Sequence, residues 1–372
     1  MKRPLDKLSV SGFKSIRELR DFELRPLNVL IGANGSGKSN FIEFFKLLAA
    51  MMRPDGLNEY VMKAGGADVF LFGGTKITPS IPVSLRFGAN GYDFEWEPAE
   101  DASFLINKEQ RHWFDTKETW TRQLGSGNKD AGLLRDQNGS SYHGDHNPSW
   151  YTYQAICSWQ TYQFHDTTRE AGVRRFQETG HDLTLANDAA NIAPYLLKLR
   201  IKHLDAYERI VRHIRIVAPF FYDFILEPEH LEGKIRLRWQ QKGLSEYPLF
   251  PTQFSDGTLR FICLATALLQ PDASLPSTLI LDEPELGLHP EAIGLLAELI
   301  KSAAQRTQVI VATQSPQLVN AFSSEDIITV KRENGATMLE RPDPADLADW
   351  LKDFSLGDLW CMNVVQGGSS HE

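Results

Sequence analysis

The sequence has few cysteines and no long apolar stretch. Its three cysteines, Cys157, Cys263 and Cys361, are far apart in a chain of 372 residues, so they predict neither a disulfide framework nor a thiolate metal site. No run of about 18 apolar residues, the length that a membrane-spanning helix needs, occurs in the chain. The basic N-terminus is not followed by the apolar segment of a signal peptide. These absences favour a soluble cytoplasmic protein with no membrane partner.

The composition is otherwise that of an ordinary globular protein. Hydrophobic residues make up 42% and charged residues 23%, which excludes wholesale disorder and collagen-like repeats. The formal net charge of −9 argues against a protein that coats nucleic acid along its whole surface, although it leaves room for a local basic patch.

The order of strand-like and helix-like segments predicts an α/β fold. Short alternating segments at residues 8–10 and 22–24 predict a small antiparallel sheet, and residues 27–31 predict a buried strand before a helix. In the last third, buried strands that include residues 279–281 and 309–312 alternate with helices. That alternation is typical of a mostly parallel sheet covered on both faces.

A glycine-rich segment lies between the first buried strand and its helix. Residues 32–39 have the sequence GANGSGKS, which matches the phosphate-binding pattern G-x-x-x-x-G-K-[ST]. Glycines let successive backbone N–H groups turn toward phosphate oxygens, and the helix N-terminus adds partial positive charge. We expect Lys38 to reach the β- and γ-phosphates of ATP and Ser39 to ligate Mg²⁺. The neighbouring residues that we expect to contact the nucleotide are Asn34, Gly35, Gly37 and Asn40.

Two adjacent acids end a buried strand in the last third. Residues 279–284, LILDEP, place Asp282 and Glu283 at its carboxyl end, where they would face a phosphate loop. We expect Asp282 to hold Mg²⁺, directly or through water, and Glu283 to polarise the attacking water, which is worth about 10²–10⁴-fold in rate. The segment alone could be an ordinary acidic turn, but its pairing with Lys38 favours an ATPase.

Residues 254–258, FSDGT, open a predicted helix shortly before these acids. The order of phosphate loop, long insertion, Ser-x-Gly turn and hydrophobic-Asp-Glu-Pro resembles the ABC-type ATPases, and the turn is similar to a variant of their signature loop. The resemblance implies that Ser255 and Gly257 contact the γ-phosphate held by a second subunit, so that ATP joins a homodimer. An ordinary helix N-cap is the other interpretation of this turn.

Two positions depart from the ABC pattern. Where that family carries a switch histidine after the next strand, the sequence has Gln314, which exchanges hydrogen bonds with water or phosphate but cannot carry charge. We expect Gln314 to act with Glu283 and Lys38 in catalysis. No glutamine occurs between the phosphate loop and Gln110, so the family's glutamine loop is absent or displaced.

Further segments resemble the RecF-like and SMC-type branch of these ATPases. Residues 8–16, LSVSGFKSI, are similar to its first strand, whose Phe-Lys-Ser element lies near the nucleotide base, so Phe13 is expected to contact the nucleotide. Residues 282–290, DEPELGLHP, resemble the RecF-like predicted ATPases and the ATPase half of the OLD-family nucleases. Residues 164–167, FHDT, resemble the stand-alone RecF-like proteins, which lack the Toprim domain.

The resemblance implies an ABC-type P-loop ATPase head with a mostly parallel sheet and an N-terminal antiparallel sheet. The head is expected in two parts, residues 1–95 and 231–372, separated by an inserted, mainly helical and loop-rich subdomain at residues 96–230. In that subdomain, the basic run from Lys198 to Arg215 could contact DNA or form an ordinary solvated helix face.

The function implied is hydrolysis of ATP, with Mg²⁺, by a nucleotide-switched dimer in DNA repair or anti-phage defence. The dimer would control DNA binding or a separately encoded nuclease or toxin effector. A second interpretation is a low-turnover ATP-sensing scaffold or inhibitor, similar to an antitoxin, of a partner protein, and Gln314 favours it. A transporter ATPase fits less well with the long insertion and the RecF-like N-terminus.

Overall fold

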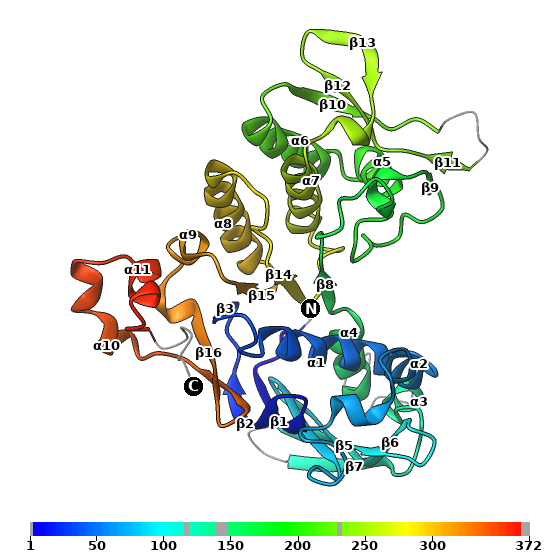
Figure 1. Cartoon of the computed structure of the whole chain (residues 1–372). Helices are drawn as coiled ribbons and strands as arrows, with labels where there is room; N and C mark the ends of the chain where they lie inside the picture. The colour runs from blue at the N-terminus through cyan, green and yellow to red at the C-terminus, as the bar shows by residue number, and fades with distance from the viewer. Residues whose placement is uncertain (1–2, 115–118, 139–146, 229–232, 366–372) are drawn as a thin grey trace.

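The central sheet of the protein is mostly parallel. The computed structural model describes residues 3–114, 119–138, 147–228 and 233–365, and Figure 1 shows their arrangement. The strand order is β17-β16-β3-β15-β14-β8, and only the β16–β17 pair is antiparallel. The strands are β3 (Leu27–Ile31), β8 (Gln160–Tyr162), β14 (Thr278–Asp282), β15 (Gln308–Thr313), β16 (Ile327–Glu333) and β17 (Ala336–Glu340).

Both faces of this sheet are buried, which explains the continuous apolar runs of its strands. Successive side chains of a strand point to opposite faces. Leu279 and Leu281 therefore lie in one hydrophobic core, whereas Ile280 lies in the other. The predicted mostly parallel sheet, covered on both sides, is confirmed.

The second sheet is antiparallel, with strand order β2-β1-β4-β5-β6-β7. Its strands are β1 (Lys7–Phe13), β2 (Ile16–Glu23), β4 (Ile81–Phe87), β5 (Asn90–Pro98), β6 (Phe104–Phe114) and β7 (Thr119–Gly125). Helix α1 (Lys38–Met51) contributes Phe41, Phe44 and Phe45 to a core that includes residues of both sheets. The predicted N-terminal antiparallel sheet is thus present, and its core is continuous with the helix that follows the phosphate loop.

Helices α7 (Asp256–Leu268) and α8 (Pro290–Ala304) cover the other face of the central sheet. The other helices outside the lobe described next are α2 (Gly56–Lys63), α3 (Leu133–Asp136), α4 (Pro148–Cys157), α9 (Pro316–Val319), α10 (Pro344–Leu347) and α11 (Leu356–Cys361). No helix in the described part of the chain is long and apolar enough to span a membrane.

A lobe of mixed structure packs beside α7 (Figure 1). It contains α5 (Ile192–Lys202), α6 (Leu204–Val217), the sheet β10 (Phe221–Ile225), β12 (Arg238–Gln241) and β13 (Leu244–Leu249), and the pair β9 (Gln177–Glu178) and β11 (Lys234–Ile235). Trp239 of this lobe stacks on Phe254 with ring centroids 4.4 Å apart. The lobe is therefore attached directly to the segment that leads into α7.

The middle of the chain is divided differently from the expected insertion at residues 96–230. Strands β6 and β7 extend the N-terminal sheet, and β8 forms the edge of the central sheet. Most side chains of β7 are exposed or half-buried, so its apolar alternation is weak and did not reveal a strand. The separate lobe begins after β8, contains strands as well as helices, and is not mainly helical.

Candidate nucleotide-binding site

The glycine-rich loop connects β3 to α1 and has the backbone shape that a phosphate loop needs. Gly35 and Gly37 have φ values of +79° and +112°, which side-chain-bearing residues rarely adopt. A Cβ on Gly37 would lie 2.0 Å from Oγ1 of Thr337. Both the left-handed backbone and the close approach of β17 therefore require glycine at this position.

Lys38 is held inside this loop. Its Nζ donates hydrogen bonds to the carbonyl oxygens of Gly32, at 2.6 Å, and Ala33, at 3.2 Å, and it lies 4.0 Å from Oε1 of Glu283. Burial lowers the pKa of Lys38, and the nearby Glu283 and Asp282 oppose that shift. An ammonium group with only carbonyl and carboxylate neighbours is suited to bind a phosphate.

The tip of the loop and the first turn of α1 lie at the surface. Asn34, Gly35 and Ser39 are exposed, and Asn40 is half-buried. Asn40 Nδ2 donates to Ser15 Oγ at 2.6 Å. The exposed loop and the first turn of α1 are therefore accessible to a ligand, and Asn40 links them to the turn between β1 and β2.

Phe13 does not lie where a nucleotide could reach it. Its side chain has no exposed surface, and its ring packs against Phe44 and Phe70 with centroids 5.4 and 6.2 Å apart. The expected contact of Phe13 with a nucleotide is therefore wrong, because the ring completes the core beneath α1. Ser15 is the residue of this element that reaches the phosphate loop: its hydroxyl is 2.7 Å from Thr337 Oγ1, which donates to Ser36 O at 2.8 Å.

The acidic residues lie where β14 and β15 end side by side. Asp282 is the last residue of β14, and it pairs with Ala312 of β15. Glu283 follows with a φ of +45°, and its N–H donates to Ala312 O at 2.8 Å. A left-handed conformation at a residue with a side chain is strained and is often retained at functional sites. It turns the chain sharply just after the strand.

Gln314 and Glu283 are in direct contact. Nε2 of Gln314 donates to Oε1 of Glu283 at 2.6 Å, and that same oxygen faces Lys38. The structure thus brings together three residues that the sequence predicted as a catalytic group, from three segments far apart in the chain.

Gln163, directly after β8, is a further residue of this site that the sequence did not reveal. Its Nε2 donates to Oδ2 of Asp282 at 2.8 Å. Gln163 follows Gln110 by more than fifty residues in the chain. Only a three-residue strand, β8, precedes it, and a strand that short gives almost no periodic signal.

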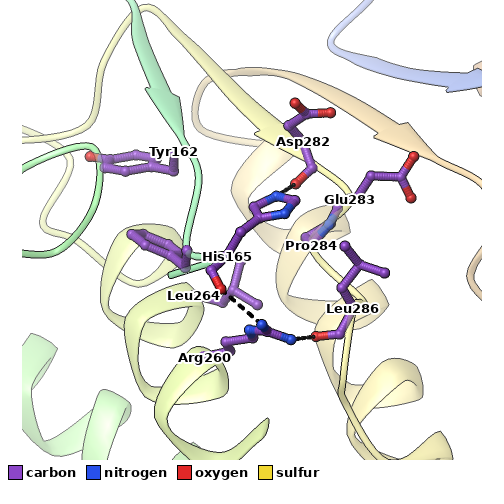
Figure 2. Close-up of a pocket in the computed structure, with 9 residues that line it drawn as sticks. Tyr162, His165, Arg260, Leu264, Asp282, Glu283, Pro284 and Leu286 are labelled. Atoms are coloured by element: carbon purple, nitrogen blue, oxygen red, sulfur yellow. Dashed lines mark hydrogen bonds between the residues drawn. The ribbon is translucent and has the colours of Figure 1, made fainter. Parts of the chain in front are cut away.

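His165 and Arg260 connect the acidic turn to α7 (Figure 2). Nε2 of His165 is 2.8 Å from Asp282 O. The guanidinium of Arg260, on α7, donates to His165 O at 2.9 Å and to Leu286 O at 2.8 Å. Arg260 therefore fixes the segment after β8 and the turn after β14 on one helix.

Glu285 is a buried carboxyl group beside the same turn. It is 6% exposed, and Thr313 Oγ1 donates to its Oε1 at 2.5 Å. Thr313 Oγ1 also accepts from Ser315 N at 3.0 Å. Burial, with a smaller contribution from Glu283, raises the pKa of Glu285 to about 7. The Glu285–Thr313 pair holds the turns after β14 and β15 together, and so it positions Glu283 against Gln314.

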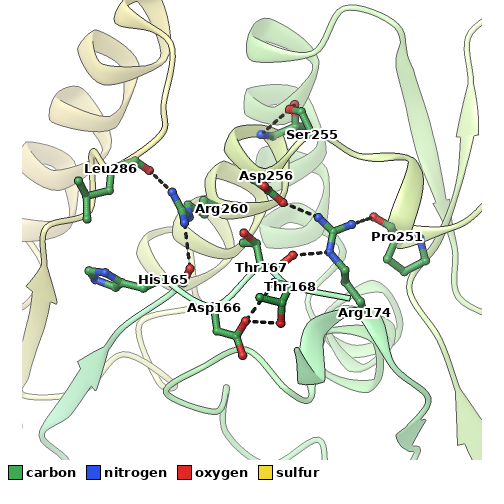
Figure 3. A network of polar contacts seen from close by, with 11 residues as sticks. His165, Asp166, Thr167, Thr168, Arg174, Pro251, Ser255, Asp256, Arg260 and Leu286 are labelled. Atoms are coloured by element: carbon green, nitrogen blue, oxygen red, sulfur yellow. Dashed lines mark hydrogen bonds and ion pairs between the residues drawn. The ribbon is translucent and has the colours of Figure 1, made fainter. Parts of the chain in front are cut away.

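The predicted signature turn begins α7 (Figure 3). Ser255 is the N-cap, and its Oγ accepts from Thr258 N at 3.1 Å. Gly257 lies against the turn after β14, because an added Cβ would be 2.4 Å from Gly287 O. The buried Arg174 donates to Asp256 Oδ1 at 2.7 Å and to Thr167 O at 2.8 Å. These contacts fix the first turn of α7 on the lobe.

Ser255 lies in an open cleft of about 710 Å³. The described residues that line it are Thr167, Thr168, Arg169, Arg174, Thr252, Phe254, Ser255 and Asp256. None of them belongs to the glycine-rich loop. The structure therefore groups Lys38, Asp282, Glu283 and Gln314 at one place and leaves the signature turn on a separate, basic and hydroxyl-rich surface.

The fold and this site are similar to those of P-loop ATPases of the ABC and SMC type. A family described as "AAA domain, putative AbiEii toxin, Type IV TA system" matches residues 27–320, and the chain belongs to that family. The matched region includes both the phosphate loop and the acidic turn.

Two solved structures show the same fold over nearly the whole chain. One is an Smc head bound to the C-terminal winged-helix domain of ScpA, with a TM-score of 0.53, 16% identity, and coverage of 94% of this chain and 99% of that one. The other is a Pyrococcus furiosus Smc head with an extended coiled coil, bound to the C-terminal domain of ScpA, with a TM-score of 0.52, 14% identity and the same coverage. At these identities the similarity extends to the fold alone.

A curated relative is similar over a shorter region. It is a putative ABC transporter ATP-binding protein of Mycoplasma genitalium, 32% identical over 124 residues, which are 29% of this chain and 33% of that protein. The chain therefore aligns with about a third of the length of this relative.

Proposed function

We propose that two copies of this chain bind ATP between them and hydrolyse it, and that the dimer opens after hydrolysis. The contact between Gln314 and Glu283, with Lys38 4.0 Å from the same carboxylate oxygen, carries the proposal. It combines a cation for phosphate, a general base and an amide that can hold a water molecule in one place.

The residues have separate roles in this scheme. Lys38 exchanges its bonds to the loop carbonyls for bonds to phosphate oxygens. Glu283 accepts a hydrogen bond from the attacking water, and Gln314 holds the Glu283 carboxylate in position. Asp282 and the exposed Ser39 hydroxyl offer the oxygen ligands that Mg²⁺ prefers, and Gln163 fixes the orientation of Asp282. The ion would supply positive charge at the β- and γ-phosphates.

The second subunit is needed because the signature turn lies outside the phosphate-loop cluster. Ser255 and the N–H groups at the start of α7 are suited to bind a phosphate, and Arg169 and Arg174 line the same cleft. A γ-phosphate bound at Lys38 of one copy would complete its coordination with Ser255 and Gly257 of the other. Nucleotide thus joins two faces that separate when the γ-phosphate leaves.

We place this switch in DNA repair or anti-phage defence, where it would control DNA binding or a separately encoded nuclease or toxin. The family description includes a putative toxin of a toxin–antitoxin system. Two Smc heads of the same fold are bound to ScpA, which supports a head that acts through a protein partner. We infer a cytoplasmic location from that role.

The decisive variant is Glu283→Gln. It keeps an oxygen that can accept from Gln314 but removes the base, so turnover is expected to fall about 10²–10⁴-fold while ATP still binds. An ATP-bound dimer is expected to accumulate in size-exclusion chromatography with light scattering. Glu291→Gln, at an exposed acid in the first turn of α8, is the matched control. Unchanged turnover without a trapped dimer would reject the scheme.

One observation favours a second candidate function, an ATP-sensing scaffold or inhibitor with low turnover. Gln314 occupies the switch position and is a neutral amide that already engages the base. In that case wild-type protein would dimerise with ATP but would hydrolyse it no faster than Glu283→Gln does. Single-turnover hydrolysis, with and without DNA, distinguishes the two functions.

A further inference from the structure

The segment between β17 and α11 exposes large apolar side chains. Trp350, Leu351 and Phe354 are 47%, 38% and 40% exposed, and the rings of Trp350 and Phe354 lie 6.2 Å apart. All residues from 348 to 354 are exposed. Two neighbouring aromatic rings on a surface are typical of a protein–protein contact.

This aromatic surface is strongly acidic. Residues 343–358 contain five aspartates, Asp343, Asp346, Asp349, Asp353 and Asp358, and a single basic residue, Lys352. Lys352 Nζ is paired with Asp349 Oδ1 at 2.6 Å. The occupant of this surface must therefore combine apolar area with positive charge.

The lobe presents a surface of that kind. Residues 192–217, which form α5 and α6, contain six basic and two acidic residues. A groove of about 410 Å³ runs along α6. Leu204 and Val211 contribute apolar side chains to it, and Arg200, Arg212 and Arg215 line it as well. On the same two helices, Ile201 and Ile216 are 70% and 60% exposed.

The chemistry of this groove favours a peptide segment over a nucleic acid. Glu208 and Asp223 also line it, so three arginines and two carboxylates face the groove together with its apolar side chains. The apolar side chains give a phosphate backbone nothing to bind. An aromatic segment flanked by aspartates, in contrast, uses both the apolar side chains and the arginines.

The segment and the groove of one chain cannot meet. Figure 1 shows α10 and α11 on one side of the molecule and α5 and α6 on another, with helices α8 and α7 between them. We infer that the acidic aromatic segment 343–354 of one copy docks in the basic α5–α6 groove of a second copy. The contact is head-to-tail, and repetition of it builds a ring or a filament.

This contact goes beyond the nucleotide-dependent dimer and does not need ATP. It uses neither the phosphate loop nor the signature turn. Aromatic side chains in a groove supply most of the affinity, and the opposite charges set the orientation and the rate of encounter. A result that rules out the head-to-tail contact therefore does not rule out the nucleotide-dependent dimer, and the reverse also holds.

The experiment measures self-association of the full chain without nucleotide, by sedimentation velocity over a range of concentrations. Wild-type protein is expected to associate, and high salt is expected to weaken the association. The variant Trp350→Ser with Phe354→Ser should associate at least about tenfold more weakly, which is the loss expected for an aromatic hot spot.

Charge reversal gives the sharper test. Asp349→Arg with Asp353→Arg reverses the charge of the segment, and Arg200→Glu with Arg212→Glu reverses the charge of the groove. Each double variant alone should lose association. A mixture of the two should recover it as an assembly in which the two variants alternate, because the basic segment of one faces the acidic groove of the other and the unaltered segment of the second faces the unaltered groove of the first. Thermal melting confirms that each variant is folded.

Three results would overturn the inference. The first is wild-type protein that stays monomeric up to about 100 μM, where even a weak specific contact is populated. The second is association that neither double variant changes, or loss that the mixture does not recover. The third is a groove variant that loses binding to an oligonucleotide but keeps its self-association, which would assign the groove to nucleic acid.

Discussion

The two halves of the proposed nucleotide site are built in different ways. At the ends of β14 and β15, side chains hold each other: the half-buried Gln314 bonds to Glu283, and the buried Thr313 bonds to Glu285. At the start of α7, Ser255 is exposed, and its hydroxyl bonds only within its own helical turn among the contacts of the described residues. The catalytic half is thus pre-organised, whereas the signature half presents its polar groups outward.

This difference indicates what fixes the positions of the polar groups in each half. Preformed contacts fix the catalytic groups before ATP arrives, which lowers the cost of reaching the reactive geometry. Contacts made by Arg174 and Gly257 hold the signature turn in place. The phosphate that this turn would bind, in contrast, is held by the second subunit. Variants in the two halves should therefore separate ATP binding from ATP turnover.

The largest effect is expected from the catalytic half. Lys38→Ala removes at least two charge-assisted bonds to phosphate, each worth about 1.5–3 kcal/mol, so ATP affinity should fall by about 10² or more. Titration calorimetry measures it, with Lys63→Ala, at the end of α2, as the control. Equal affinity in both variants would remove Lys38 from the site.

Removal of the buried charge at Glu285 should have the next largest effect. The carboxyl has a pKa of about 7 when folded, above the ordinary value of 4.5 for a glutamate, so the folded state binds more protons than the unfolded state across this range. The contribution of Glu285 to stability is therefore largest at low pH and falls as pH rises through these two pKa values, by about 3 kcal/mol in total. Glu285→Gln keeps the hydrogen bond from Thr313, but its stability should no longer fall in this way as the pH rises. Denaturation at about pH 5 and about pH 8 compares the two proteins; equal pH dependence would contradict the prediction.

The signature half should separate binding from hydrolysis. Ser255→Ala is expected to leave the ATP affinity of a single subunit unchanged, because Ser255 lies outside the phosphate-loop cluster. Turnover should fall about tenfold, which is the effect of one lost hydrogen bond to a charged group. Ser323→Ala removes a comparable N-cap bond elsewhere and controls for the loss of stability. If Ser255→Ala weakened ATP binding by isolated monomers, the proposed division between the two subunits would be wrong.

The smallest effect is expected at Gln163. Gln163→Ala frees the Asp282 carboxylate from its amide partner, so the Mg²⁺ concentration needed for half-maximal turnover should rise several-fold, as expected when a residue that orients a metal ligand is lost. Gln160→Ala, at the start of β8, is the control. A changed maximal rate with an unchanged Mg²⁺ requirement would assign Gln163 to the chemical step instead.

Local sequence motifs predicted those parts of the site whose structure depends on residues that are neighbours in the chain. The glycines and Lys38 form a loop through their own backbone preferences, and Asp282 and Glu283 follow from a strand that ends in acids. Phe13 was misplaced because its burial depends on α1 and on Phe70, which no motif links to it. Gln163 was missed because it reaches Asp282 through sheet pairing between β8 and β14 across more than a hundred residues.

Thr337 gives the hairpin β16–β17 a role beyond closing the sheet. Its hydroxyl bonds to Ser36 in the phosphate loop and to Ser15, and the strand that carries it continues into the acidic aromatic segment. A partner that shifts this hairpin would change the affinity of the loop for phosphate. By thermodynamic linkage, nucleotide would then change the affinity for that partner by the same factor. Strand β17 would thus couple the assembly made by the acidic aromatic segment to the nucleotide state of the phosphate loop.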